Sequence, residues 1–150
     1  MASRSALLLA LAAFAAAQDP GAARVDLTAL VRHYAAVEAE LLAAPVPADP
    51  VVAGRRLAAI AALRAYRERG IFGQDRWDGS RSPRFVDDAG RRCAVGWLLD
   101  CTGQGELTVA IARQHNQAWV AELGGVPGLA AWLHENGLTL AEAARIQGPH

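Results

Sequence analysis

The chain of 150 residues contains no lysine, so its 15 basic residues are all arginine, and 15 acidic residues balance them. The formal net charge is therefore zero. Nucleic-acid-binding domains usually carry a net positive charge with aromatic residues interleaved among the basic ones. We therefore expect no nucleic-acid partner.

The sequence also lacks the motifs that hold metals and cofactors. The spacings CxxC, HxxxH and HExxH, which are typical of zinc sites, do not occur. Neither GxGxxG nor the P-loop pattern is present, so a nucleotide-binding fold is not indicated. We expect no metal ion and no cofactor.

A long apolar run occurs only at the start of the chain. Arg4 precedes an uncharged run from Ala6 to Ala17, and small residues stand immediately before Gln18. This pattern is typical of a secretory signal peptide, and the run is shorter than the roughly 20 residues of a membrane-spanning helix. No cysteine precedes Cys93, which excludes a lipid-bearing cysteine at the cut. We predict a signal peptide over 1–17, one domain over 18–150, and export to the periplasm or the medium in soluble form.

The domain is predicted to be mainly α-helical, with five or six helices. Asp26 is a good N-cap for a helix to about residue 44, and Asp49 with Pro50 begins a second helix that ends at Gly70. Further helices are expected at 96–100, 106–116, 129–135 and 139–146. The last of these has a capping box formed by Thr139 and Glu142.

Apolar residues of the first helix follow helical spacing and predict one buried stripe: Leu27, Leu30, Val31, Tyr34, Val37 and Leu41. His33 and Glu38 lie off this stripe, and we expect His33 to be solvated.

The middle of the chain is predicted to be the least helical part. Glycine, serine and proline interrupt any periodicity over 71–83, which predicts a long loop. Two β-like runs, 84–86 and 91–95, surround an Asp/Gly turn at 87–90 and predict a small central β-hairpin.

Charge is distributed unevenly along the chain. Ten arginines and five acidic residues lie between Arg55 and Arg92, while acidic residues are in excess on both sides of this segment. Such a basic segment could meet an anionic partner, or its arginines could pair with the acidic ends inside one fold. For the first alternative, the candidate binding residues are Trp77, Arg81, Arg84, Arg91 and Arg92.

The two cysteines leave three alternatives open. A disulfide is common in exported proteins, but if Cys93 and Cys101 shared one helix their Cα atoms would be about 12 Å apart, beyond the roughly 4.4–6.8 Å of a disulfide. Free cysteines also pack well as small hydrophobes. In the third alternative Cys93 is a nucleophile, whose pKa the neighbouring arginines and a helix start would lower. His115 would then be the base, with Asn116 or Asp100 as the orienting group.

Several motifs resemble a family of small secreted bacterial proteins that are uncharacterised. They are Phe85-x-Asp87-x-x-Gly90-x-x-Cys93-Ala94-Val95-Gly96-x-Leu98, then Ala112 to Asn116, Gly137-Leu138-Thr139 and Ile146-Gln147. The resemblance covers roughly the last two thirds of the mature chain. It implies a defined fold, and the family has no known activity to transfer. We expect a non-enzymatic binding protein that acts through the basic loop between Gly70 and Arg92, with a cysteine-dependent hydrolase as the alternative.

Overall fold

The computed structural model describes residues 26–77 and 79–148. In these ranges the chain forms six α-helices, one 3₁₀ helix and a two-stranded antiparallel sheet. The predicted mainly helical fold with a small β-hairpin is therefore confirmed. The predicted signal peptide lies outside the described residues. Over the described ranges, no helix combines the length and apolarity needed to cross a bilayer.

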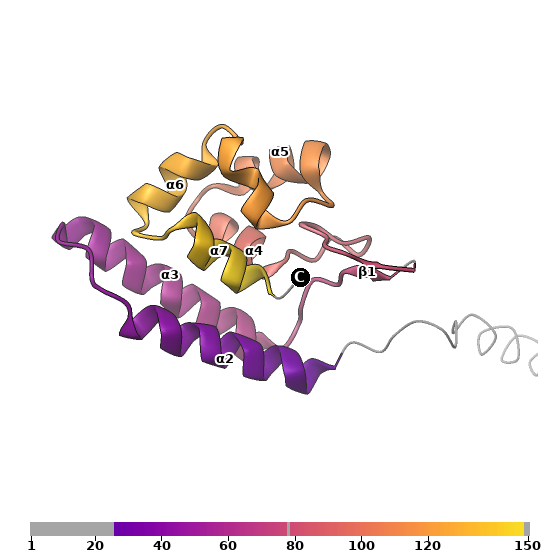
Figure 1. Ribbon diagram of the computed structural model, residues 1–150, viewed down its shortest axis with the longest axis horizontal. Coiled ribbons are helices and arrows are strands. Elements are labelled where there is room, and N and C mark those ends of the chain that lie inside the picture. Colours follow the sequence, from indigo (N-terminus) through magenta and orange to yellow (C-terminus); the bar gives the residue numbers. More distant parts are fainter. Residues whose placement is uncertain (1–25, 78, 149–150) are drawn as a thin grey trace, which may run out of the picture.

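A helical hairpin of α2 (Leu27–Ala43) and α3 (Pro50–Arg69) forms one layer of the molecule (Figure 1). The predicted caps set its boundaries: the Asp26 side chain accepts from Ala29 N at 3.1 Å, and Asp49 accepts from Val51 N at 2.7 Å. Gly70 ends α3 with a φ of 67°, a conformation that glycine adopts without steric cost.

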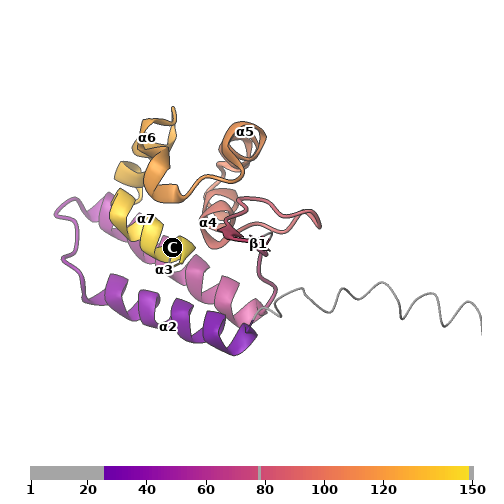
Figure 2. The ribbon, with the colours of Figure 1, turned by 45° about the vertical axis from the view of Figure 1, so that its right-hand side comes forward.

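The second layer contains the remaining helices, which stack on this hairpin (Figures 1 and 2). They are α4 (Ala94–Cys101), α5 (Gly105–His115), the 3₁₀ helix η1 (Val120–Gly125), α6 (Leu129–Glu135) and α7 (Leu140–Gln147). Helices α4 and α7 contact each other, and they reach the hairpin through α3 and α2 respectively. The core lies between the layers, where Val37 and Leu63 meet Leu99 and other fully buried apolar residues.

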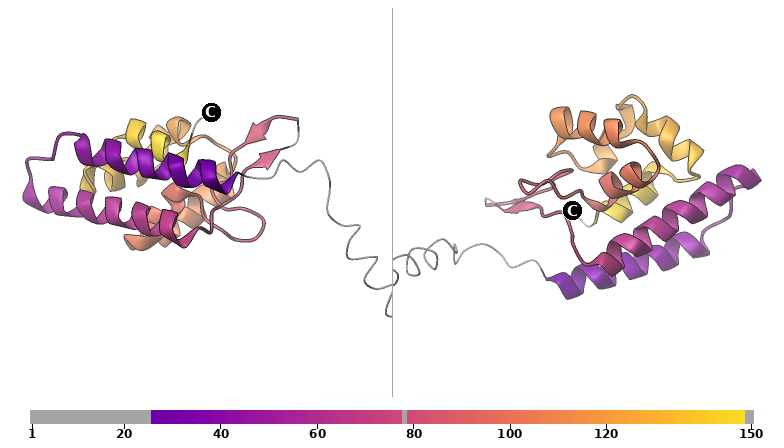
Figure 3. Two further views of the ribbon diagram at one scale, coloured as in Figure 1. Left: turned by 90° about the horizontal axis from the view of Figure 1, so that it is seen from below. Right: turned by 180° about the vertical axis from the view of Figure 1, so that it is seen from behind.

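The β-hairpin lies earlier in the chain than predicted. Strand β1 (Arg76–Trp77) pairs with β2 (Arg81–Ser82) inside the segment that we expected to be a loop, and this hairpin projects at one end of the molecule (Figure 3). The predicted strands at 84–86 and 91–95 contribute only the single bridge between Val86 and Arg92. The reason is that Cys93 already caps α4, so the chain turns helical before a second strand can form.

The buried face of α2 differs from the predicted apolar stripe at its edges. Leu27 and Val31 are 53% and 37% exposed. Glu38, which lies off the stripe, is buried because Arg64 Nε donates to its Oε1 at 2.6 Å and Arg67 Nη2 donates to its Oε2 at 3.0 Å. Ion pairing therefore buries an edge of α2 that the apolar pattern leaves out.

Candidate functional site

A pocket of about 280 Å³ opens at the end of the molecule that carries the β-hairpin, since Trp77 and Arg81 of that hairpin line it. Helix α2 supplies one wall with Asp26, Ala29, Leu30, His33 and Tyr34. The remaining walls come from four other segments of the chain: Gly73 to Asp75 with Trp77, then Arg81, then Cys93, and finally Gln147 with Gly148. The pocket thus joins three of the predicted site residues, Trp77, Arg81 and Cys93, with residues that the sequence analysis did not select.

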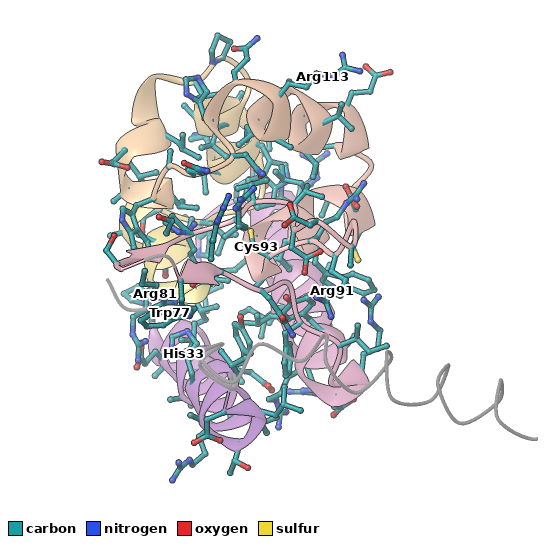
Figure 4. The ribbon with its side chains drawn as sticks, turned by 90° about the vertical axis from the view of Figure 1, so that its right-hand side faces the viewer. His33, Trp77, Arg81, Arg91, Cys93 and Arg113 are labelled. Atoms are coloured by element: carbon teal, nitrogen blue, oxygen red, sulfur yellow. The ribbon has the colours of Figure 1, made fainter. Side chains whose placement is uncertain are left out.

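Figure 4 looks toward this end of the molecule and shows His33, Trp77 and Arg81 close together, with Cys93 nearby. Arg113, on α5, lies on a different part of the molecule.

Arg81 is held by an ion pair inside the hairpin. Its Nε donates to Asp75 Oδ2 at 2.6 Å, and Asp75 Oδ1 accepts from Arg84 N at 3.3 Å. The Arg81 guanidinium also lies 5.4 Å from the centroid of the Trp119 ring, within the range of a cation–π contact. The positive charge of Arg81 is therefore compensated where it lines the pocket.

His33 is half-buried and connects α2 to α7, so the expectation that it is solvated is wrong. Arg145 Nη1 lies 3.1 Å from His33 Nδ1, and His33 Nε2 lies 3.4 Å from Ile146 O. A guanidinium only donates hydrogen bonds, so Nδ1 accepts and the ring proton sits on Nε2, directed at the carbonyl. Burial lowers the pKa of His33 and outweighs the bond to Ile146, which raises it. The ring is neutral at pH 7.

This neutral histidine should make stability depend on pH between about 7 and 5. In the unfolded chain a histidine has a pKa near 6.5, whereas the pKa of His33 in the folded protein is lower. Below about pH 6.5 the unfolded state therefore binds a proton more readily than the folded state does. The free energy of unfolding is therefore expected to be highest above about pH 7 and to fall as the pH decreases through about 6.5. His33→Gln should flatten this part of the curve, as measured by urea denaturation at several pH values.

The carboxylates provide a separate reference for that experiment. The pKa values of Asp87 and Glu142 are lowered despite burial, because Arg91 and backbone amides bond to Asp87 and Arg56 bonds to Glu142. These two carboxylates contribute to the free energy of unfolding until the pH falls below about 4, the pKa of Asp and Glu in the unfolded chain. The His33→Gln protein should therefore still lose stability below about pH 4. If the free energy of unfolding of His33→Gln fell between pH 7 and 5 as steeply as that of the wild type, His33 would not be the source of this pH dependence.

Cys93 caps the N-terminus of α4, in agreement with the predicted helix start. Its thiol pKa, however, is not lowered. Its Sγ accepts from Gly96 N at 3.4 Å. Burial raises the pKa of the Cys93 thiol to about 12 and outweighs the amides of Gly96 and Val95, which lower it. The predicted lowering of the Cys93 pKa is therefore wrong, because the thiol stays protonated and a thiolate is the required nucleophile.

The other groups of the hydrolase hypothesis are engaged elsewhere. His115 is exposed at the end of α5 and does not line the pocket that reaches Cys93. The Asn116 side chain accepts from Val86 N at 2.8 Å and donates to Val86 O at 2.9 Å, so it fixes the loop. Asp100 Oδ2 accepts from Arg92 Nε at 2.9 Å. Within 26–77 and 79–148, the predicted nucleophile, base and orienting group are not assembled.

The two thiols do not form a disulfide in this fold. Both cysteines are free, with Cys93 buried and Cys101 exposed. Cys93 is the N-cap of the eight-residue helix α4, and Cys101 is its last residue. The rise of the helix therefore separates their Cα atoms by about 12 Å. A disulfide tolerates at most about 7 Å. The alternative of buried structural thiols therefore holds for Cys93 alone.

Thiol labelling should distinguish the two cysteines. Native protein is expected to react with iodoacetamide at Cys101 and to leave Cys93 unlabelled, with the same intact mass before and after reduction. The matched control is Cys101→Ser, which iodoacetamide at neutral pH should leave unlabelled until the protein is denatured. Rapid labelling of Cys93 in that variant at neutral pH would revive the hydrolase hypothesis, and a native mass two hydrogens lower would indicate a disulfide.

The predicted binding arginines are paired with acidic residues of the fold. Besides the Arg81 pair, the Arg–carboxylate distances are 3.7 Å for Arg84–Asp88, 2.7 Å for Arg91–Asp87 and 2.9 Å for Arg92–Asp100. Arg56 pairs with Glu142 on α7, and Arg64 and Arg67 pair with Glu38 on α2. Four arginines of the basic middle thus pair with the acidic ends, as that alternative expects: Arg56, Arg64, Arg67 and Arg92. Arg81, Arg84 and Arg91 pair instead with carboxylates of the middle segment itself.

The described ranges hold no group of three or more His, Cys, Asp or Glu side chains that could bind a metal ion together. Sequence reasoning missed His33 and Gln147 as pocket residues. For His33 a signal existed, since Asp26, Leu30 and His33 follow the i, i+4, i+7 spacing of one helix face.

Comparisons with protein-family models, with curated proteins and with solved structures found no match. The class of the protein is therefore defined here by its fold and site alone: a two-layer helical domain with a small ligand-sized pocket.

Proposed function

We propose that this protein is a non-enzymatic binding protein that takes a small molecule into the pocket between α2 and the β1–β2 hairpin. The pocket itself carries the proposal. It has walls from five segments of the chain, and its lining is mainly apolar with a few polar groups at fixed positions, as in most ligand sites. The central loop thus acts through Trp77 and Arg81 and not through an exposed arginine surface.

A binding role fits the chemistry of the lining better than catalysis does. The one nucleophilic side chain in the described lining, Cys93, has a raised pKa, and both nitrogens of His33 are engaged in hydrogen bonds within the fold. A general base needs a free lone pair directed at the reacting group. The observed groups hold the walls of a pocket together instead.

Closing the pocket should remove binding without unfolding the protein. Ala29 is an exposed residue of α2 that lines the pocket, so Ala29→Trp places a large side chain at its mouth without removing a buried group. Ligands from a small-molecule library that raise the melting temperature of the wild type are expected to lose this effect in Ala29→Trp. The matched control is Ala39→Trp, at an exposed position of the same helix that does not line the pocket.

The outcomes of this screen separate pocket binding from other binding. Ligands that stabilise both tryptophan variants as well as the wild type would bind elsewhere, and the proposal would fail.

Export to the periplasm or the medium remains part of the proposal, supported by the pattern of residues 1–17. The intact mass of the protein recovered from a bacterial periplasm or medium tests it. The expected mass corresponds to a chain that begins at Gln18. An uncut chain retained in the cytoplasm would overturn this part.

A further inference from the structure

We propose that the pocket binds an uncharged, largely apolar molecule of about the size of two fused aromatic rings; this inference rests on the proposed function. It follows from three properties of the described lining: its volume, the pairing of its charged groups, and its aromatic side chains.

The volume sets the size of the ligand. The pocket encloses about 280 Å³. A cavity of roughly 150 Å³ lined by apolar side chains binds a single benzene, and typical drug-sized ligands occupy roughly 300–1,000 Å³. The present pocket therefore matches a molecule, or the inserted part of one, with about twice the bulk of benzene.

The charges of the lining make a charged ligand unfavourable. Arg81 and Asp75 form an ion pair with an N–O distance of 2.6 Å, so an anion or a cation would have to compete with an existing partner. His33 is neutral because burial lowers its pKa, and it lies against Ile146 O and Arg145. A charge brought out of water beside Arg81 and His33 loses its hydration and meets only an ion pair that is already formed and a neutral ring.

Two other polar side chains of the lining, Gln147 and Asp26, have hydrogen bonds within the fold. Gln147 Oε1 accepts from Val120 N at 2.7 Å, and its Nε2 lies 3.5 Å from Ala118 O. The Asp26 carboxylate at the rim accepts from Ala29 N at 3.1 Å and faces the positive end of the α2 dipole. The amide of Gln147 is therefore already engaged within the fold.

The apolar part of the lining provides aromatic surface. Tyr34 is 5% exposed in the wall, and its ring packs edge-on against Tyr66 at a centroid distance of 5.3 Å. Trp77 is 55% exposed, which is unusual for the largest apolar side chain, and it stands beside His33 and Arg81 (Figure 4). Aromatic pairs prefer offset or edge-on contacts at these separations. A flat ring system entering the pocket would contact Tyr34 and cover Trp77.

Three probes with the same ring system test the charge and the size together: 2-naphthol, 2-naphthoate and 2-naphthylmethylammonium. Titration calorimetry of the mature protein at pH 7.5 measures each affinity. We expect 2-naphthol to bind and both ions to bind at least about tenfold more weakly, a factor that corresponds to the loss of one favourable contact. Ala29→Trp should weaken 2-naphthol binding at least about tenfold, and Ala39→Trp should leave it unchanged.

The results separate this inference from the proposed function. If an ion binds as tightly as 2-naphthol and loses affinity in Ala29→Trp, the pocket is a ligand site of other chemistry and only this inference falls. A second outcome also contradicts the ligand class alone. In it, Ala29→Trp changes the binding of no naphthalene probe, but it does weaken binding of ligands found in the library screen. If neither experiment responds to Ala29→Trp, both proposals fall.

Cys93 locates the bound probe independently. In Cys101→Ser protein, Cys93 is the remaining thiol, and it lines the pocket. Saturating 2-naphthol is expected to slow modification of Cys93 by methyl methanethiosulfonate at pH 9 by about tenfold, since the reagent must pass through the same space. An unchanged rate in the presence of bound 2-naphthol would place the probe elsewhere and overturn the inference.

Discussion

Arg56→Ala is expected to lower the free energy of unfolding by about 3 kcal/mol, at the low end of the range for removing one partner of a buried ion pair. The Arg56 side chain is 5% exposed and its partner Glu142 is 23% exposed. Partial solvation of the remaining carboxylate keeps the expected cost at the lower limit of that range.

The size of this effect follows from how many segments Arg56 joins. Its Nη2 donates to Leu41 O at 2.9 Å and to Glu142 Oε1 at 2.7 Å, and its Nη1 donates to Gly137 O at 2.5 Å. One side chain on α3 therefore satisfies the end of α2, the turn after α6 and the start of α7. Alanine would leave both carbonyls without this partner, and an unsatisfied buried acceptor costs about 1–3 kcal/mol.

Urea denaturation of three variants measures it. Arg55→Ala, at the exposed neighbouring position, is the matched control and should stay within about 0.5 kcal/mol of the wild type. Arg56→Lys keeps the charge but not the planar donor fork, so it should recover only part of the loss. Equal stability of Arg56→Ala and Arg55→Ala would refute this account.

Sequence predicted the helix boundaries well because capping is local. Asp26, Asp49 and Thr139 each accept from a backbone amide two or three residues further on, so a window of a few residues contains the whole interaction. The same holds for Gly70, whose positive φ ends α3. The predicted helices after residue 96 begin and end within a few residues of those observed.

Burial of polar side chains could not be predicted in the same way. Arg56 is the first buried residue of α3, one turn before the buried Ala59 and Ile60, and its partner Glu142 is 86 residues away. Glu38 likewise needs two arginines of α3 to become buried. Helical periodicity assigns such residues to solvent because it contains no information on which distant charge will meet them.

The pocket could not be predicted from the sequence for the same reason, since it depends on contacts between distant residues. Its walls come from residues near positions 30, 75, 81, 93 and 147, and no local pattern connects these positions. For Cys93, sequence reasoning found the helix start correctly but judged the pKa from neighbouring arginines. Asp87 and Asp100 bind those arginines, and burial then determines the pKa of the thiol.

Gly73→Ala is expected to lower the free energy of unfolding by about 1–3 kcal/mol and to weaken binding in the pocket. A Cβ on Gly73 would lie 2.6 Å from Arg92 O and 2.9 Å from Cys93 N, both backbone atoms that cannot rotate away. The loop would have to move off the segment that begins α4. That shift would break the bonds from Gly73 N to Arg92 O at 3.2 Å and to the Tyr66 hydroxyl at 3.0 Å.

The functional part of the effect follows because Gly73 and Cys93 both line the pocket. Separating them displaces Gln74 and Asp75, and with Asp75 the ion pair that holds Arg81. We expect 2-naphthol affinity to fall at least about tenfold, measured where denaturation curves show that more than about nine tenths of the variant is folded. Under that condition a loss of affinity reports the altered pocket and not the unfolded fraction.

Gly54→Ala is the control that separates a close approach from the general effect of removing a glycine. Gly54 lies within α3, and apart from its chain neighbours and the backbone of its own helix no atom lies within 4 Å of the position of a Cβ. Alanine there should stabilise the protein by about 0.5–1 kcal/mol, since it restricts the unfolded chain and favours the helix. If Gly73→Ala also stabilised the protein and kept 2-naphthol affinity, the loop would not be pinned against α4. The wall of the pocket would then be free to move, and the pocket volume would no longer limit the size of the ligand.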